Sequence, residues 1–127
     1  MPRTRVSTGS AMEKQAGYSR AIVAGDWCFV SGTTGYDYAT MDMPGDVAGQ
    51  ARNAFATIEK TLNEAGFALA DIVRVVYYVT DEKDSGVVMS IAGEFMGDIR
   101  PAATMVVAGL VKPEMKVEIE ATALRAA

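Results

Sequence analysis

The sequence contains no histidine and a single cysteine, Cys28, among its 127 residues. Histidine is the commonest metal ligand and the usual general base, and every Ser–His or Cys–His nucleophile depends on it. Its absence argues against a transition-metal site and against a catalytic triad. One cysteine cannot form an intrachain disulfide, so we expect a cytoplasmic protein in which Cys28 is inert core. Any catalysis must use carboxylates, hydroxyls, Lys or Arg, backbone dipoles and bound water.

Long apolar runs and an excess of basic residues are also missing. No apolar segment approaches membrane-spanning length, and the polar residues 1–10 lack the apolar core of a secretory signal. The net charge is −4, whereas a nucleic-acid-binding domain normally has a basic face. We therefore expect neither a membrane nor a nucleic acid as a partner.

The remaining composition is that of an ordinary globular protein, with 50% hydrophobic and 22% charged residues. A chain of this length can bury a real core, and no linker or repeat divides it. The sequence therefore predicts one domain that spans residues 1–127.

Hydrophobic periodicity predicts the order β-β-α-β-α-β-β. Residues 1–16 are polar and are expected to be irregular or loosely paired. The predicted strands are residues 18–23, 27–31, 71–80, 104–108 and 116–124. Asp46 can cap a long helix that ends at Gly66, and Asp84 or Ser85 can cap a shorter one that ends before Gly97.

This order indicates an α+β fold in which one mixed sheet carries two helices on a single face. The central strands nevertheless place apolar residues on both faces. In the strand at 71–80, Val73, Val75, Tyr77 and Val79 alternate with Arg74, Val76 and Tyr78. An apolar face without helices predicts burial against another copy of the chain.

The last strand carries two glutamates, which are poor strand formers. Val117, Ile119 and Ala121 share one face, while Glu118, Glu120 and Thr122 share the other. Either this face is exposed to solvent, or one of the carboxylates on it has a function.

In addition, the chain resembles the RidA/YjgF family of reactive intermediate deaminases. The likeness extends from the region of Tyr18 to Leu124. The stretches that carry it are Ser31-Gly32, the helix start at residues 46–53, Glu64-Ala65-Gly66, Asp71-Ile72-Val73, Arg100-Pro101-Ala102 and residues 117–121. The resemblance implies a chorismate-mutase-like α+β fold and a homotrimer with small-molecule clefts between subunits. Family members hydrolyse enamines and imines such as 2-aminoacrylate. The resemblance implies neither a cofactor nor a metal.

The resemblance also implies a set of site residues. Glu120 would position the catalytic water, and the Gly32 backbone would polarise the ligand, with Ser31 and Thr33 beside it. Tyr18 either donates its hydroxyl to a ligand or is a half-buried strand tyrosine. Thr104 could add a hydroxyl. For Glu120 the alternative is a solvated residue or one paired with Lys116 or Arg74, and Glu118 is expected to be such a surface residue.

One family feature is absent. Where the family has an arginine that grips the substrate carboxylate, this sequence has Ala103, and two other family pocket positions are Met89 and Met105. Two charge-assisted hydrogen bonds contribute roughly 1.5–3 kcal/mol each, so their loss would weaken binding of a small carboxylate by about two to four powers of ten. Methionines would make the pocket more apolar and adaptable. We therefore expect a larger, less anionic ligand, unless Arg74 or Arg100 replaces the missing cation.

These residues support three hypotheses. The first is a Rid-type hydrolase or deaminase that acts on an enamine, an imine or a related unsaturated metabolite other than 2-aminoacrylate. The second is a trimeric protein that binds a small ligand without turning it over. The third, an endoribonuclease, fits an acidic chain without histidine least well.

Overall fold

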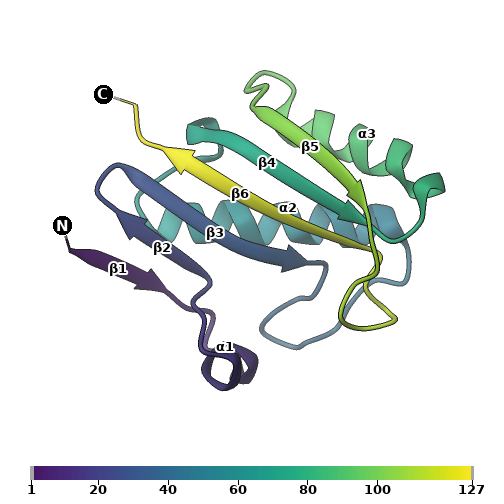
Figure 1. Cartoon of the computed structure of the whole chain (residues 1–127), viewed down its shortest axis with the longest axis horizontal. Coiled ribbons are helices and arrows are strands. Elements are labelled where there is room, and N and C mark those ends of the chain that lie inside the picture. The colour runs from purple at the N-terminus through teal and green to yellow at the C-terminus, as the bar shows by residue number, and fades with distance from the viewer. Residues whose placement is uncertain (1, 127) are drawn as a thin grey trace.

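A computed structural model describes residues 2–126, which form one six-stranded mixed sheet with three α-helices (Figure 1). The strands are β1 (Arg3–Val6), β2 (Ala21–Ala24), β3 (Trp27–Thr34), β4 (Ile72–Val79), β5 (Ala102–Val107) and β6 (Val117–Leu124). The helices are α1 (Ala11–Ala16), α2 (Val47–Glu64) and α3 (Ser85–Met96), with short 3-10 helices at Leu69–Asp71 and Glu82–Asp84. The strand order is β1-β2-β3-β6-β4-β5, and β4 and β5 run parallel while the other neighbours are antiparallel.

The long helix α2 has the predicted limits. The Asp46 side chain accepts a hydrogen bond from the backbone N–H of Gly49, which satisfies one of the free donors of the first turn. At the other end Gly66 has φ +84°, a left-handed conformation that glycine adopts without steric cost. Phe55, Ile58 and other residues of its apolar stripe are fully buried against the sheet.

Helix α3 connects the parallel strands β4 and β5 and lies with α2 behind the sheet in Figure 1. Val88 and Ile91 of its predicted stripe are buried, and Phe95 stacks on Phe55 of α2 with ring centroids 4.8 Å apart. The prediction of two helices on one face of the sheet is therefore confirmed.

Burial along β6 follows the strict alternation of a sheet with one covered face, and β4 follows it from Val75 onward. On β6, the residues from Val117 to Ala123 at odd positions are buried and those between them are half-buried. The prediction for β4 is wrong at Val73, which is exposed. The pairing with β6 shifts register between Ile72 and Arg74, so Ile72 takes the buried position instead.

The expectation that residues 1–16 are irregular or loosely paired is met only in the pairing, and the helix α1 was not expected. β1 pairs with β2 at the edge of the sheet, and α1 follows at its corner (Figure 1). The buried Glu13 organises this segment, because its carboxylate accepts hydrogen bonds from the hydroxyls of Ser7, Thr8 and Ser10. Burial alone would raise the pKa of Glu13, but these hydrogen bonds outweigh burial and lower it.

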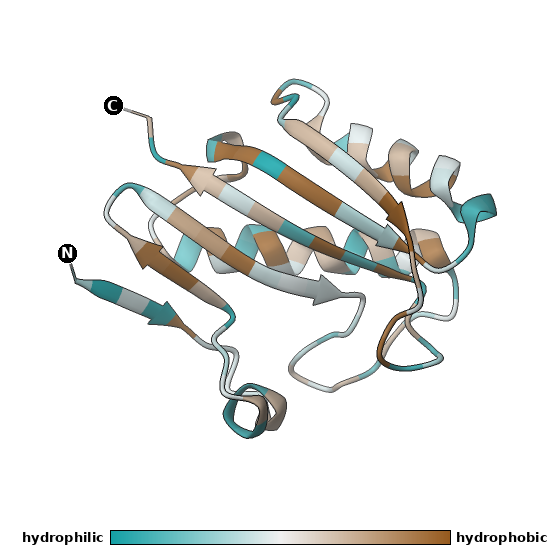
Figure 2. Ribbon diagram, viewed as in Figure 1, coloured by the Kyte–Doolittle hydropathy of each residue, from teal (hydrophilic) through white to brown (hydrophobic). Residues whose placement is uncertain are grey.

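The face of the sheet opposite α2 and α3 is uncovered and partly apolar. Trp27 and Phe29 of β3 are 42% and 48% exposed and stack on each other, and Val106 of β5 is 38% exposed. The hydropathy colouring in Figure 2 shows β4 as brown along most of its length. We call this surface the open face.

Candidate functional site

A cleft of about 620 Å³ lies on the open face, where β3, β4 and β6 meet the segment that follows β5. We call it the sheet cleft. Its lining residues are Gly32, Tyr78, Ala108, Gly109, Leu110, Val111, Glu118 and Glu120. It therefore combines two carboxyl groups, a phenol, backbone amides and an apolar wall, as small-molecule sites commonly do.

A β-bulge forms one side of the sheet cleft. The pairing of β3 with β6 shifts register between Val30 and Thr33, so Ser31 and Gly32 lie outside the regular ladder. Three side-chain hydrogen bonds hold this bulge: Arg20 Nη2 donates to the Gly32 carbonyl (2.5 Å), Ser31 Oγ to the Ser19 carbonyl (2.6 Å), and Thr33 Oγ1 to the Ser31 carbonyl (2.9 Å). Thr33 is fully buried, so its hydroxyl supports the bulge from inside.

Glu118 lies directly against the bulge. An ideal Cβ built on Gly32 would overlap the Oε2 atom of Glu118 and would lie 3.0 Å from its Cδ. Burial raises the pKa of the Glu118 carboxyl, the Arg20 guanidinium opposes this, and the charge of Glu120 raises it further. The sequence interpretation of Glu118 as a solvated surface residue is therefore incorrect, and more of this carboxyl is protonated near neutrality than for a free glutamate.

Glu120 makes a different contact in the same cleft. The Tyr78 hydroxyl donates a hydrogen bond to its Oε1 atom. This bond is the main cause of the raised pKa of Tyr78, and burial adds to it. The contact replaces the pairing with Lys116 or Arg74 that the sequence left open.

The sequence interpretation missed Arg20, which lies behind the bulge. The residue is only 1% exposed, and its guanidinium carbon lies 5.9 Å and 5.2 Å from the ring centroids of Tyr18 and Tyr38. Burial raises the pKa of Tyr18, and the charge of Arg20 opposes the rise. The sequence signal was a charged residue inside an otherwise uncharged strand pattern, Tyr18-Ser19-Arg20-Ala21.

The two arginines that the sequence suggested as substitutes lie elsewhere. Arg74 is exposed on β4 and is close enough to Tyr78 to lower its pKa slightly. Arg100 is exposed in the turn before β5, with the left-handed φ of +53°. Neither lines the sheet cleft.

Four of the predicted site residues lie at the other edge of the molecule. β5 is three strands away from β3, which at about 4.8 Å per strand is about 14 Å. Thr104 is in register with Val76 and, through it, with Glu120, so it shares the open face. Ala103 and Met105 pair with residues of β4 that are buried under the helices, and Met89 is 57% exposed on α3.

One chain therefore brings Ser31, Gly32 and Glu120 together, with Tyr18 nearby, but does not bring Met89, Ala103 or Met105 to them. The described residues contain no group of three or more His, Cys, Asp or Glu that could hold a metal ion. Cys28 is buried in the core, and burial raises the pKa of its thiol. No helix in the described part of the chain is long and apolar enough to cross a bilayer.

Comparison with known proteins places this architecture in a family. The family model described as Endoribonuclease L-PSP matches residues 8–125. A RutC family protein from Pyrococcus horikoshii is 30% identical over 121 residues, which cover 94% of this chain and 96% of that protein. The chain belongs to the RidA/YjgF family.

Solved structures of RidA/YjgF proteins match the whole fold. Rv2704 from Mycobacterium tuberculosis, described as a member of the YjgF/YER057c/UK114 family, is 42% identical, with a TM-score of 0.89 over 97% of this chain and 99% of that one. RidA from the Antarctic bacterium Psychrobacter sp. is 25% identical, with a TM-score of 0.81 over 94% and 93% of the two chains. The chorismate-mutase-like α+β fold expected from the RidA/YjgF resemblance is therefore confirmed.

Proposed function

We propose that the protein is a cofactor-free hydrolase that converts an enamine or imine to a carbonyl compound and ammonia in the sheet cleft. Membership of the RidA/YjgF family supports this reaction class. The observation that carries the proposal is the position of Glu118, a partly buried carboxyl with a raised pKa against the Gly32 backbone. A raised pKa leaves a larger fraction of the carboxyl protonated at neutral pH, and the protonated form can act as a general acid.

The chemistry requires one proton donor and one ordered water. Glu118 would donate a proton to the β-carbon of the enamine, and the nitrogen lone pair would form the C=N bond of an iminium ion. Water would add to the C=N carbon and lose a proton to the Glu118 carboxylate. Glu118 would then give this proton to the nitrogen as the C–N bond breaks, and its carboxylate would take the hydroxyl proton as the C=O bond forms, so that the products are the carbonyl compound and ammonia and Glu118 is protonated again.

Glu120 has the supporting role in this scheme. The sequence interpretation assigned it the positioning of water, and its second carboxylate oxygen can still do so. Its Oε1 atom accepts the Tyr78 hydroxyl hydrogen bond, which fixes the orientation of the carboxylate. We therefore assign proton transfer to Glu118 and the orientation of water to Glu120.

A homotrimer would complete the site. Ala103 and Met105 lie on the edge strand β5, far from the bulge of the same chain, and Met89 is exposed on α3. If each copy placed its β5 edge against the β3 bulge of the next, these residues would reach the sheet cleft, and such a head-to-tail contact closes into a ring. The exposed aromatic pair Trp27 and Phe29 would then be buried against a neighbour.

The lining of this completed cleft favours a substrate with an apolar side chain. β5 carries no charged residue, with Ala103 in place of the arginine that binds a carboxylate in the family. Leu110 and Val111 add apolar surface to the sheet cleft. We therefore propose a substrate larger and less anionic than 2-aminoacrylate.

Hydrolysis of imines generated in situ from a panel of amino acids tests this function. The panel should include leucine, methionine and phenylalanine as apolar members and serine and aspartate as small or acidic ones. Glu118→Gln should lower the rate by about 10²–10⁴-fold, which is the usual contribution of general acid–base catalysis. Glu59→Gln, on the exposed side of α2, is the matched control and should leave the rate unchanged. Equal rates for wild type and buffer with every imine would refute the hydrolase.

A second candidate is a trimeric protein that binds a small ligand without chemistry. The uncharged β5 edge favours it, because the cation expected of a family deaminase is replaced there by Ala103. This function predicts that apolar ligands raise the melting temperature of the protein and are recovered unchanged. Turnover of any bound ligand would exclude it.

The description of the family model names an endoribonuclease, but we propose that RNA is not the substrate. Two carboxyl groups in the sheet cleft and a net charge of −4 would repel a phosphate backbone. An RNA oligonucleotide should therefore stay unbound and uncut even at low salt. Salt-sensitive RNA binding would contradict this proposal.

A further inference from the structure

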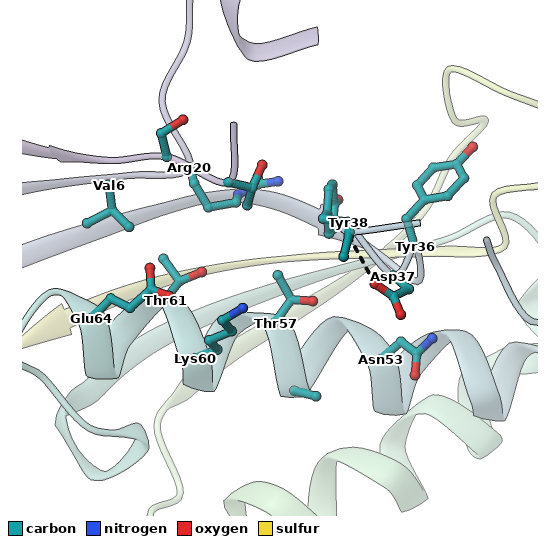
Figure 3. Close-up of a pocket in the computed structure, with 14 residues that line it drawn as sticks. Val6, Arg20, Tyr36, Asp37, Tyr38, Asn53, Thr57, Lys60, Thr61 and Glu64 are labelled. Carbon is teal, nitrogen blue, oxygen red and sulfur yellow. Dashed lines mark hydrogen bonds between the residues drawn. The ribbon is translucent and has the colours of Figure 1, made fainter. Parts of the chain in front are cut away.

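A second cleft lies on the other side of the bulge, between α2, the end of β1 and the loop that follows β3 (Figure 3). We call it the helix cleft. It has a volume of about 450 Å³, which lies within the range of small-molecule sites. It shares none of its lining residues with the sheet cleft. The chemistry proposed above makes no use of it.

The helix cleft contains charges of both signs that do not pair with each other. Arg20 and Lys60 contribute the positive charges, and Asp37 and Glu64 the negative ones. Lys60 and Glu64 are four residues apart on α2, yet neither they nor Asp37 form an ion pair with any residue in the described range 2–126. Figure 3 shows Thr57 and Lys60 rising from α2 toward the strands. The cleft thus presents cations, carboxylates and hydroxyls within one small volume, and the Asp37 carboxylate there already accepts a hydrogen bond from the Ala39 amide (2.9 Å).

Arg20, which lines the helix cleft, has a buried hydrogen-bond donor without a partner in the described part of the chain. The side chain is 99% buried, and its Nη2 atom donates to the Gly32 carbonyl. Its Nε N–H is buried as well and makes no hydrogen bond with any acceptor among residues 2–126. A buried donor of a charged group is rarely left without a partner, because its desolvation is then uncompensated. Arg20 lines the helix cleft, so an acceptor bound there would become that partner once the guanidinium turns Nε toward the cleft.

We propose that the helix cleft binds a zwitterionic small molecule of the α-amino acid class. The carboxylate of the ligand would accept hydrogen bonds from Arg20 Nε and Lys60, and its ammonium group would face Asp37 and Glu64. A dianion such as phosphate fits less well, since the two carboxylates would repel it. A simple cation also fits less well, because the buried guanidinium of Arg20 would repel it. This site is separate from the sheet cleft and does not depend on the proposed hydrolase activity.

Isothermal titration calorimetry of the full-length protein with the twenty standard L-amino acids tests the proposal. At least one should bind, and its analogues that lack only the carboxylate or only the ammonium group should each bind at least tenfold more weakly. Lys60→Gln and Asp37→Asn change exposed side chains and should fold normally, and each should also weaken binding at least tenfold. Lys83→Gln, on an exposed 3-10 helix, is the matched control and should have no effect.

Two further variants separate the two clefts. Glu118→Gln should change amino acid binding much less than Lys60→Gln does, because Glu118 does not line the helix cleft and acts on it only through the charge of Arg20. Arg20→Lys keeps the charge but removes Nε and should abolish binding; if it does not fold, the Lys60 and Asp37 variants decide the question. The proposal is overturned if no amino acid binds at millimolar concentration, if either single-charge analogue binds as well as the parent, or if binding responds to Glu118→Gln but not to Lys60→Gln.

Discussion

Replacing Gly32 by alanine should separate the function of the sheet cleft from the stability of the fold. The added Cβ would overlap Oε2 of Glu118 and would lie 3.0 Å from its Cδ, so the carboxyl must leave its present position. The atoms that must move are the far end of a flexible side chain. The φ angle of Gly32 is outside the left-handed region, so the backbone accepts alanine without strain.

The magnitudes of the two effects differ widely. A displaced, off-rotamer Glu118 costs about 0.5–1.5 kcal/mol, and the lower entropy of the unfolded alanine variant offsets about 0.4–1 kcal/mol of this. The free energy of unfolding should therefore stay within about 1 kcal/mol of wild type. Turnover should fall by about 10²–10⁴-fold, because the general acid is displaced. Burial is the main reason for the raised pKa of Glu118, so this pKa should fall toward the ordinary glutamate value.

Three measurements check this reasoning. Urea unfolding gives the stability, imine hydrolysis gives the rate, and NMR titration of carboxyl-labelled glutamate gives the pKa of Glu118 without relying on any activity. Gly93→Ala is the matched control. Its Cβ would meet nothing within 4 Å in the interior of α3, so it should stabilise the protein by about 0.5–1 kcal/mol and leave the rate unchanged. A Gly32→Ala protein with an unchanged Glu118 pKa would refute the close packing on which the site rests.

Other predictions concern the two unusual carboxyl groups and the open face. The pKa of Glu118 is raised in the folded state, so its contribution to stability is fully present below the ordinary value of 4.5 and is lost as pH rises through the folded pKa. Glu118→Gln should therefore be as stable as wild type in acid and more stable than wild type at neutral pH. Urea unfolding at several pH values measures this difference. The pKa of Glu13 is lowered, so its contribution to stability is present above pH 4.5 and disappears as pH falls through the folded pKa. Glu13→Ala should lower the free energy of unfolding by about 2–3 kcal/mol at pH 7 and speed hydrogen exchange at the Tyr18 amide. A loss of stability that persists at low pH would contradict the charge-based explanation. Phe29→Lys places a charge on the open face and should convert the proposed trimer to folded monomers. Analytical ultracentrifugation measures the oligomeric state, and circular dichroism shows whether the variant is folded. A variant that stays trimeric would show that this face is not the interface.

Local sequence signals were sufficient to predict the elements whose ends or buried faces are set by residues within or next to the element itself. Asp46 and Gly66 mark the ends of α2 through contacts within a few residues of each, and the alternation along β6 sets its buried face directly. β1 lacks such signals, whereas α1 has them in Ser10, whose side chain caps its first turn, and in Gly17 at φ +73°, and the sequence interpretation overlooked them. Arg3, Thr4 and Arg5 are polar and exposed, and together with the half-buried Val6 they become a strand by pairing with β2, while α1 is only six residues long and also depends on the hydrogen bonds to Glu13.

The site was harder to predict because it depends on register. The sequence places Glu118 and Glu120 on one strand face, but the bulge at Ser31 and Gly32 decides which of them lies against the glycine. A shift of this kind leaves no trace in the alternation of either strand. Arg20 was missed for a related reason, since only the folded chain brings it behind the bulge, twelve residues away in sequence.

The position of the only tryptophan has a practical consequence for work with this protein. Trp27 lies half-exposed on the open face and stacks on Phe29. The emission of an indole shifts to shorter wavelength when water leaves its surroundings. The intrinsic fluorescence of the chain therefore comes from a single position on the surface where a second copy would dock, and it offers a label-free optical measure of subunit association in dilute solution.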